Sequence, residues 1–530
     1  MIVYTPSSER SLSLFKTPFE QQLDPSNRWV VMADVVPWDE MAKVFFANMS
    51  ADHGRASVDL RVVLGALLVK HIEGLSDEDT IQYIQENIYA QYFVGLSSFQ
   101  TTAVFSPTLF VEIRKRLGEP GVVYLNDMLL HQAKEVGAIK HKVSRQPKSN
   151  RDKDDHAGTT SIDSADSPPQ DQPTEQASKN KGTLKLDATV APQHVGYPTD
   201  TRLLSDARLS SEELIDLLYY GVGLWNKKPR TYRKEAKKKY LSFAKNRKPS
   251  KKVIRRATRE QLGYLRRNLK HIHRMLDQIE AEGLAIPWTH YHLRRFWVLQ
   301  EFYNQQQTMY KDGRRRVDHR IVNIAQPYVR PIKRGKAGAA TEFGAKINVS
   351  ETEGFARMDR VDFNNFNEST GLIAQVEAYK QLYGYYPEVV LADRIYLTRK
   401  NRKYLKDNGI RNSGAPLGRP PQLSKHEKQK RRKEQNKRSH IEGKFGQAKS
   451  KYGMDDIKTR RQDTSFACIG LILLALNAIK LCQQAFFAVF EALFSLRQYL
   501  MPVYLHIEQQ QTKLITAKML TQPQNPHYSE

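Results

Sequence analysis

A segment almost free of aliphatic residues divides the chain and limits how it can fold. Residues 140–182 consist largely of Ser, Asp, Gln, Pro and Lys. A stretch with so few apolar side chains cannot bury enough surface to offset the entropy that it would lose on ordering. We therefore predict a disordered linker at residues 140–182, with a separately folded part on each side of it.

The part before the linker, residues 1–139, predicts an all-α domain. We expect two helices within residues 58–96, because Gly74 interrupts the apolar pattern and Ser76 is a typical N-cap ahead of three acidic residues. Such a helix-turn-helix arrangement binds DNA in some proteins and is ordinary helical packing in many more. The second helix is acidic, which slightly favours ordinary packing.

The part after the linker has the pattern of a mixed α/β domain at residues 183–480. A C-terminal helix and tail are expected at residues 481–530, and a large helical insert at about 205–318. Strand-like patterns lie at residues 183–190, 320–332, 343–349 with 354–361, and 387–392. Further helical patterns lie at residues 371–383, 437–451 and 466–500.

The charge of the chain is strongly positive and unevenly distributed. Lys and Arg number 83 against 57 Asp and Glu, a formal net charge of +26. Residues 227–274 alone hold 20 basic residues and two acids, with aromatic residues interleaved. This pattern favours contact with nucleic acid phosphates, and the alternative is a solvated helical hairpin. The basic residues that we select as DNA contacts in this insert are Lys237, Lys238, Arg255 and Arg256.

Several classes of protein are disfavoured by what the sequence lacks. Cys468 and Cys482 show neither zinc-site spacing nor a disulfide framework, which fits a reducing compartment. The N-terminus has no signal-peptide pattern, and the apolar run at residues 466–476 is too short to span a bilayer. No glycine-rich loop ends in Gly-Lys-Ser/Thr. We therefore expect no export, no membrane insertion and no nucleoside triphosphate.

Three acidic residues lie where a sheet and a helix would present them together. Asp187 lies in the strand pattern at 183–190, Asp393 directly follows the apolar run at 387–392, and Glu442 lies in the helical pattern at 437–451. Phosphodiester chemistry commonly uses a few carboxylates around two Mg²⁺ ions. Taken singly, an Asp after a strand is often an N-cap and a Glu on a helix is usually solvated. Only the joint arrangement predicts a catalytic site.

Three motifs give these acids a family context. They are LDATVAPQHVGYPTDTRLL around Asp187, YGYYPEVVLADRIYLTRKNRKYLKDNGIR around Asp393, and RSHIEGKFGQAKSKYG around Glu442. Together they resemble the DDE transposases of bacterial insertion sequences, over most of the chain from about residue 57 to about residue 480. The resemblance implies an RNase H-like mixed sheet with helices on both faces.

The resemblance also implies roles for individual residues. Asp187, Asp393 and Glu442 would hold two Mg²⁺ ions, for which Mn²⁺ would substitute, with Asp187 shared between the ions. Arg438 and Lys449 would match the Arg and Lys of a Tyr-Arg-Glu-Lys signature and hold DNA phosphates; the alternative is a pair of surface salt bridges. The signature's Tyr is replaced by Gln435. Further expected DNA contacts are Lys346, Asn401 and Arg402.

The function implied is metal-dependent cleavage of double-stranded DNA at the ends of an insertion sequence, followed by attack of the 3′-hydroxyl on target DNA. Two ends must be brought together, so a homodimer in a DNA synaptic complex is expected. Such an endonuclease would act in the bacterial cytoplasm, on the nucleoid. Two alternatives stay open from the residues: a catalytically silent DNA-binding regulator and a nuclease on the same fold.

Overall fold

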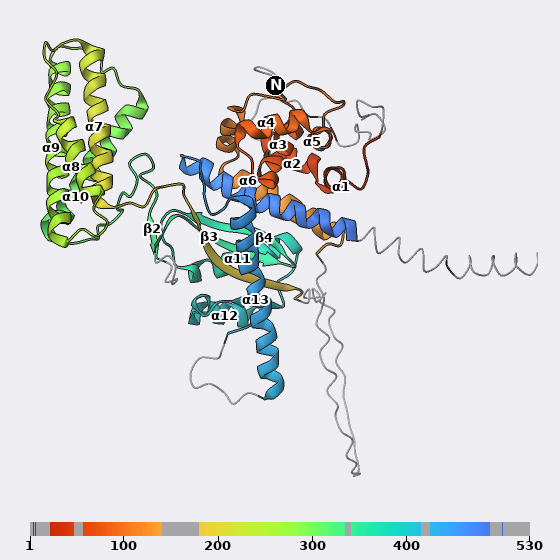
Figure 1. Cartoon of the computed structure of the whole chain (residues 1–530). Coiled ribbons are helices and arrows are strands. Elements are labelled where there is room, and N and C mark those ends of the chain that lie inside the picture. Colours follow the sequence, from red (N-terminus) through yellow and green to blue (C-terminus); the bar gives the residue numbers. More distant parts are fainter. Residues whose placement is uncertain are drawn as a thin grey trace, which may run out of the picture. The chain divides into compact units, whose positions relative to one another are not determined.

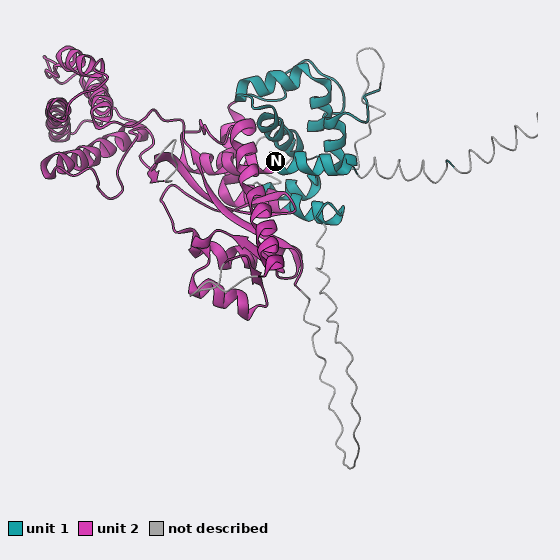
Figure 2. Ribbon diagram, turned by 60° about the horizontal axis from the view of Figure 1, so that its bottom comes forward, with its two compact units in different colours: residues 1–106, 128–140, 475–530 teal, residues 107–127, 141–474 magenta. Residues whose placement is uncertain are grey.

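The computed structural model describes residues 4, 6, 22–46, 57–139, 180–333, 341–414, 424–487 and 501. The chain separates into two compact units (Figure 2). Unit 1 comprises Met1–Ser106, Met128–Lys140 and Ala475–Glu530, and unit 2 comprises Pro107–Asp127 and His141–Leu474. Almost all of the predicted linker, residues 140–179, lies outside the described residues.

The described part of unit 1 is largely helical. Its helices are α1 (Arg28–Val35), α2 (Trp38–Phe46), α3 (Leu60–Glu73), α4 (Asp77–Glu86), α5 (Ile88–Val94) and the end of α6 (Leu109–Glu135). The buried guanidinium of Arg61 lies 4.5 Å from the ring centroid of Trp38, and Trp38 packs edge-on against Phe93. A buried cation of this kind needs such partners, since an ion in an apolar core is otherwise costly.

Two helices were predicted at residues 58–96, but this segment forms three, α3, α4 and α5. The predicted break and cap are confirmed, because Gly74 ends α3 in the left-handed conformation and the Ser76 side chain accepts a hydrogen bond from the backbone of Asp79. The additional break is Asn87. Its backbone is extended, and its side chain caps α5 by accepting a hydrogen bond from Ala90.

Unit 2 is built around a mixed sheet (Figure 1). Its strands are β1 (Thr183–Pro192), β2 (Pro331–Lys333), β3 (Thr341–Thr352), β4 (Phe355–Asp362), β5 (Val389–Ala392) and β6 (Arg411–Asn412). The strand order is β2-β3-β1-β5-β6, and β4 also pairs with β3. β1, β3 and β4 pair antiparallel, whereas β5 is parallel to both β1 and β6. The predicted strands at 183–190 and 387–392 are thereby confirmed. The candidate at 343–349 with its extension at 354–361 forms two antiparallel strands, β3 and β4.

The shorter elements of unit 2 connect and flank these strands. They are α11 (Leu372–Tyr383), α12 (Arg399–Asp407), α13 (Lys425–Tyr452) and the 3-10 turns η3 (Glu368–Gly371) and η4 (Arg394–Tyr396). The predicted helix at 371–383 is confirmed as α11. The helix predicted at 437–451 begins earlier than expected, because Ser424 and Glu427 form a reciprocal capping box at its N-terminus.

The strand predicted at residues 320–332 is mostly wrong, because only Pro331–Lys333 forms a strand there. The preceding backbone is bonded locally and to side chains: the Ile321 N–H donates to Gln305 Oε1, and the Val329 N–H donates to the Gln326 carbonyl. Pro327 has no N–H to offer a neighbouring strand. The apolar residues of this segment therefore pack as a connection and do not extend the sheet.

The basic insert between β1 and β2 is an assembly of helices: α7 (Asp200–Val222), α8 (Arg233–Ala244), α9 (Lys251–Ala281) and α10 (His290–Asp312). Helix α9 shows how its sequence encodes the packing. Its apolar residues recur every three or four positions and are buried, namely Leu262, Leu265, Leu269, Ile272, Met275 and Ile279. The basic residues are left on the opposite face. The insert has a hydrophobic core of its own, formed with buried residues of α7 and α10.

The apolar helix predicted near the C-terminus is described over Gln462–Phe487. It begins earlier and is longer than the apolar run used to exclude a membrane span, so that reasoning from length was wrong. By length and composition this helix could cross a membrane, yet 78% of its most apolar window is buried within the protein. Such burial is typical of a core helix. The remainder of the predicted segment, except Met501, lies outside the described residues.

Gly344 marks a close approach of two strands and yields a prediction. A Cβ atom at this position would lie 2.0 Å from the carbonyl oxygen of Ala191 in β1, and backbone atoms cannot rotate away. We expect Gly344→Ala to reduce the free energy of unfolding by about 1–3 kcal/mol, measured by denaturant titration. Gly263→Ala is the matched control, because a Cβ on Gly263 meets no neighbour within 4 Å. It should stabilise α9 by about 1 kcal/mol, and equal losses in both variants would contradict the prediction.

Candidate active site

The register of β1 and β5 brings two of the predicted acids together. These parallel strands are paired from Thr183 opposite Val389 to Leu186 opposite Ala392. Asp187 and Asp393 are the next residues of each strand, and neighbouring strands lie about 4.8 Å apart. β5 ends at this point and the chain turns into η4, so Asp393 stands at a strand end. There its side chain accepts a hydrogen bond of 2.6 Å from the backbone N–H of Arg394.

Helix α13 places the third acid near the first through Arg438. This helix packs against β1 and β5. The Arg438 guanidinium lies 3.5 Å from Asp187 Oδ2 and 3.2 Å from Glu442 Oε1. Asp187 and Arg438 are mostly buried, whereas 55% of the Glu442 side chain is exposed. One cation therefore connects two carboxylates that are far apart in the sequence.

Burial has a clear effect on the ionisation of Asp187. It raises the pKa of this carboxyl to about 6, although the N–H of Ala188 and the Arg438 guanidinium both favour the charged form. The carboxylates of Glu368 and Glu442 add a smaller increase to the pKa. A nearby cation would stabilise the ionised form of this carboxyl, because a positive charge offsets the cost of ionisation in a buried position.

A pH dependence of stability follows for the metal-free protein. The pKa of Asp187 is higher in the folded chain than in the unfolded chain, where Asp titrates near 3.9. Its stabilising contribution is therefore present below about pH 4 and lost as the pH rises through about 6. In a chelator, the wild type should lose about 2–3 kcal/mol of unfolding free energy relative to Asp187→Asn between about pH 4 and pH 7. A pH-independent difference between the two proteins would show that the pKa is not raised.

A fourth carboxylate, Glu368 of η3, was not predicted. It raises the pKa of Asp187, which places it within electrostatic range of that acid. Its own partner is Lys346 of β3, with Nζ 2.9 Å from Glu368 Oε1. The Lys346 ammonium also donates to the Phe366 carbonyl at 2.9 Å. Lys346, predicted as a DNA contact, is thus held inside the protein by these partners. No local pattern marks Glu368, because its place beside β1 depends on the fold of the loop after β4.

Two residues of the motif around Asp393, Asn401 and Arg402, hold neighbouring elements together. Asn401 is 4% exposed, and its amide nitrogen donates hydrogen bonds of 2.7 Å to the carbonyls of Ser369 and Tyr396. This replaces the DNA contact predicted for it, because the side chain is buried and fastens η3 and η4 to α12. Half-buried Arg402 donates from Nε to the Leu397 carbonyl at 2.9 Å. Lys449 lies two turns after Glu442 on α13, half-buried.

The predicted basic contacts of the insert are exposed and lie on two helices. Lys237 and Lys238 are on α8, and Arg255 and Arg256 are on α9. Arg255 lies 4.6 Å from the ring centroid of Tyr310, and Arg256 pairs with Glu260 at 3.2 Å while 74% exposed. These side chains project from the surface, as contacts to a phosphate backbone require.

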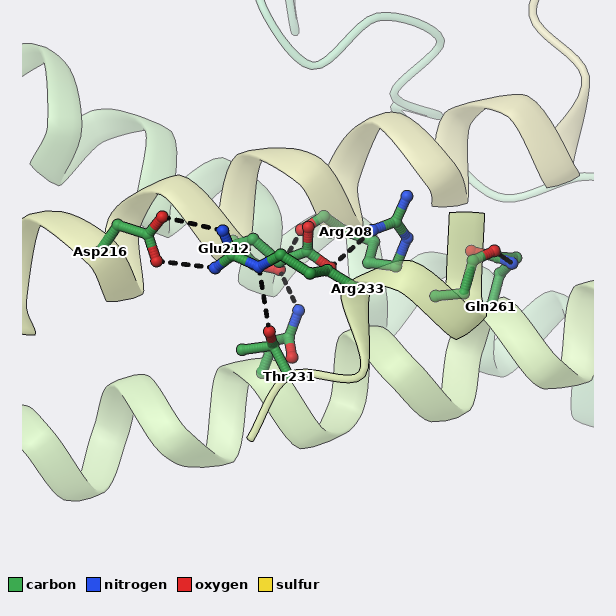
Figure 3. Close-up of polar contacts among 9 residues, drawn as sticks. Arg208, Glu212, Asp216, Thr231, Arg233 and Gln261 are labelled. Atoms are coloured by element: carbon green, nitrogen blue, oxygen red, sulfur yellow. Dashed lines mark hydrogen bonds and ion pairs between the residues drawn. The ribbon is translucent and has the colours of Figure 1, made fainter. Parts of the chain in front are cut away.

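Polar contacts fasten the helices that carry these residues (Figure 3). Arg233, at the start of α8, makes two hydrogen bonds of 2.9 and 2.7 Å to Asp216 of α7. Within α7, the almost fully buried pair Arg208 and Glu212 lies 2.5 Å apart. Gln261 of α9 donates to the Ala236 carbonyl of α8 at 3.2 Å. The basic face is therefore presented by a fixed support.

Comparison with known proteins places the chain in a family. Residues 390–478, which include Asp393, Arg438 and Glu442, match the family described as a transposase DDE domain. Residues 17–116 match a second family, described as a transposase domain (DUF772). Both matches are to transposase domains, and together they support a DDE transposase of insertion-sequence type. The two matches confirm the resemblance seen in the sequence motifs. One lies in the N-terminal part of this transposase and the other in its C-terminal part.

Individual relatives of the transposase add little about its chemistry. It is 26% identical over 198 residues to the uncharacterized protein ORF8 in the nfe locus of Rhizobium meliloti, covering 37% of this chain and 77% of that protein. No solved structure matches the chain.

The family uses divalent metal ions, and the acidic residues of this transposase fit such a group. Carboxylate oxygens are the ligands that Mg²⁺ prefers. Asp187 and Glu442 already accommodate a positive charge between them, that of Arg438. Within the described ranges, no three His, Cys, Asp or Glu side chains are gathered closely enough to form a ready metal cage. Asp187, Asp393 and Glu442 are the residues that would hold such an ion.

Proposed function

We propose that this transposase cuts DNA strands at the ends of an insertion sequence and transfers the freed 3′-hydroxyl into target DNA. The observation that carries the proposal is the convergence of three acids from separate elements. Asp187 and Asp393 follow the last paired residues of adjacent parallel strands, and Arg438 joins Asp187 to Glu442. Such a set is suited to metal-assisted phosphoryl chemistry.

The sheet supports an RNase H-like assignment for this unit. Three antiparallel strands, β4, β3 and β1, are followed across the sheet by the parallel strands β5 and β6. Ligands of open α/β sheets lie at the carboxyl ends of the parallel strands. Asp393 occupies that position on β5, next to Asp187.

In the proposed mechanism Asp187, Asp393 and Glu442 would hold the metal ions, with Asp187 shared. Two Mg²⁺ ions, when bound, would activate a water and stabilise the attacking and leaving oxygens of the displacement. Arg438 would stand beside the reacting phosphate, because it contacts both Asp187 and Glu442. Its planar guanidinium can bind two phosphate oxygens at once, which would hold the strand in place. Lys449, two turns further along α13, would bind the next part of the backbone.

The proposal includes duplex DNA as substrate and a homodimer that brings the two element ends together. Its basic insert would bind the flanking backbone, because residues 227–274 carry an excess of 18 positive charges. The affinity of that contact should fall steeply as the salt concentration rises.

The deciding experiment incubates the purified full chain with the DNA that flanks its own gene, in Mg²⁺ or in Mn²⁺. Strand cuts are mapped to the nucleotide, and joined products are sequenced. Cleavage at the element ends with joining, both abolished by a chelator, is the expected result. Cleavage without joining would identify a nuclease instead. Binding without cleavage in either metal would identify a DNA-binding regulator.

A further inference from the structure

A cavity of about 240 Å³ lies at the base of the insert, away from the three acids. It is open to solvent on one side and is lined by residues of α7, α10 and the two segments that connect the insert to β1 and β2. Residues that line it include Pro198, Arg202, Leu203, Tyr291, Arg294 and Asn323. The cavity is smaller than the roughly 300–1,000 Å³ of sites for drug-sized ligands. It therefore suits one small unit of a larger molecule.

Three arginines, Arg202, Arg294 and Arg295, line the cavity together with one carboxylate, Asp206. Arg294 is exposed and forms no hydrogen bond or ion pair within the part of the chain that the structure describes. Arg202 lies across Gly196, where a Cβ would be 2.5 Å from two guanidinium nitrogens, and reaches Asp206 only at 4.0 Å. Arg295 is already paired with Glu213 at 2.8 Å. The lining residues thus include three guanidinium groups and one carboxylate, and this surplus of positive charge suits an anion.

Exposed aromatic side chains accompany these cations. Tyr291 lines the cavity and is 60% exposed, and the Arg295 guanidinium lies 5.8 Å from its ring centroid. Trp297 is 61% exposed and lies one helical turn after Arg294. Tyr197, next to the lining residue Pro198, is 71% exposed. Rings presented beside arginines offer faces on which nucleic acid bases stack.

The cavity is close enough to the three acids for one DNA strand to reach both. Gly196 lines the cavity and follows Asp187 by nine residues, so at most about 30 Å of chain separates them. A DNA strand advances about 3.4 Å per nucleotide. One strand about nine nucleotides long can therefore reach from the acids to the cavity.

We propose that this cavity binds one unpaired nucleotide of a DNA strand, with its phosphate between Arg202 and Arg294 and its base against Tyr291. A paired nucleotide would not fit, because its base is stacked within the duplex and its face is covered. The proposal rests on the proposed function, since it takes the ligand to be DNA. It adds a site that distinguishes single strands from duplexes and that does not require a metal ion.

The test measures binding of the full chain in a chelator to two fluorescent probes. One is an oligothymidine of about 12 nucleotides and the other is a duplex of equal length. Arg294→Gln and Tyr291→Ala should each weaken oligothymidine binding by about five-fold to a hundred-fold. Their affinity for the duplex should stay within about two-fold of the wild type. Both side chains are exposed, so both variants should fold, which is checked by circular dichroism.

Arg266→Gln is the matched control, because this exposed arginine of α9 loses the same charge outside the cavity. It should weaken binding to both probes to the same degree. The proposal is overturned if the cavity variants behave like Arg266→Gln, or if they leave oligothymidine binding unchanged. Because the probes are bound without metal, this outcome is independent of strand cleavage. The site can thus fail while the proposed function holds, and the reverse is also possible.

Discussion

Asp187→Asn should reduce metal-dependent strand cleavage by at least about a thousand-fold while leaving DNA affinity unchanged. Asn keeps the shape of the side chain but removes the negative charge that a shared metal ligand needs. A thousand-fold loss corresponds to about 4 kcal/mol of transition-state stabilisation, since each 1.36 kcal/mol changes the rate tenfold. Cleavage is measured on end-labelled element DNA, and affinity by a gel shift in a chelator.

The same result is expected for the other two acids, Asp393→Asn and Glu442→Gln. Asp407→Asn is the control, because Asp407 is exposed at the end of α12 and takes no part in the site. It should cleave at the wild-type rate. Cleavage that survives any one of the three substitutions in Mg²⁺, with DNA binding intact, would refute the assignment of that acid.

Arg357→Met should lower the free energy of unfolding by about 3–5 kcal/mol. Arg357 of β4 makes two hydrogen bonds of 2.7 and 3.0 Å to Asp127 of α6, and a third of 2.7 Å to Asp359. Removing the guanidinium leaves two carboxylates without their main counter-charge, and Asp359 is almost fully buried. The loss is measured by denaturant titration of the full chain.

Two further observations separate this mechanism from a simple packing defect. Burial already raises the pKa of Asp359 in the presence of Arg357, so the variant should raise it further. A carboxyl whose pKa is raised by folding destabilises the folded state increasingly as the pH rises from the unfolded pKa through the folded one, so the deficit should be smaller at about pH 5 than at about pH 8. Arg360→Ala, on the same strand but with a side chain 44% exposed, should cost less than about 1 kcal/mol. Equal losses in both variants would contradict the buried-charge explanation.

Much of the secondary structure around the site could be predicted because the signals are local. The apolar run before Asp393 forms β5, the alternating pattern around Asp187 forms β1, and the polar helix with Glu442 forms α13. Each of these patterns involves residues within a few positions of one another. The strand predicted at 320–332 is mostly absent because the partners of its backbone are not set by the local pattern. Its apolar residues satisfy a strand pattern. However, its prolines lack an N–H, and other backbone N–H groups of the segment donate to a side chain or to a nearby carbonyl.

By itself, then, the sequence determined the family, the strand and helix that carry each acid, and the excess of positive charge on the insert. The tertiary structure decided which groups meet. The parallel pairing of β1 with β5 makes Asp187 a neighbour of Asp393, and Arg438 joins Glu442 to Asp187. The fold also buries Asn401 and brings Glu368 within range of Asp187. Strand register and burial depend on residues that are remote in the chain, and no local pattern of side chains specifies them.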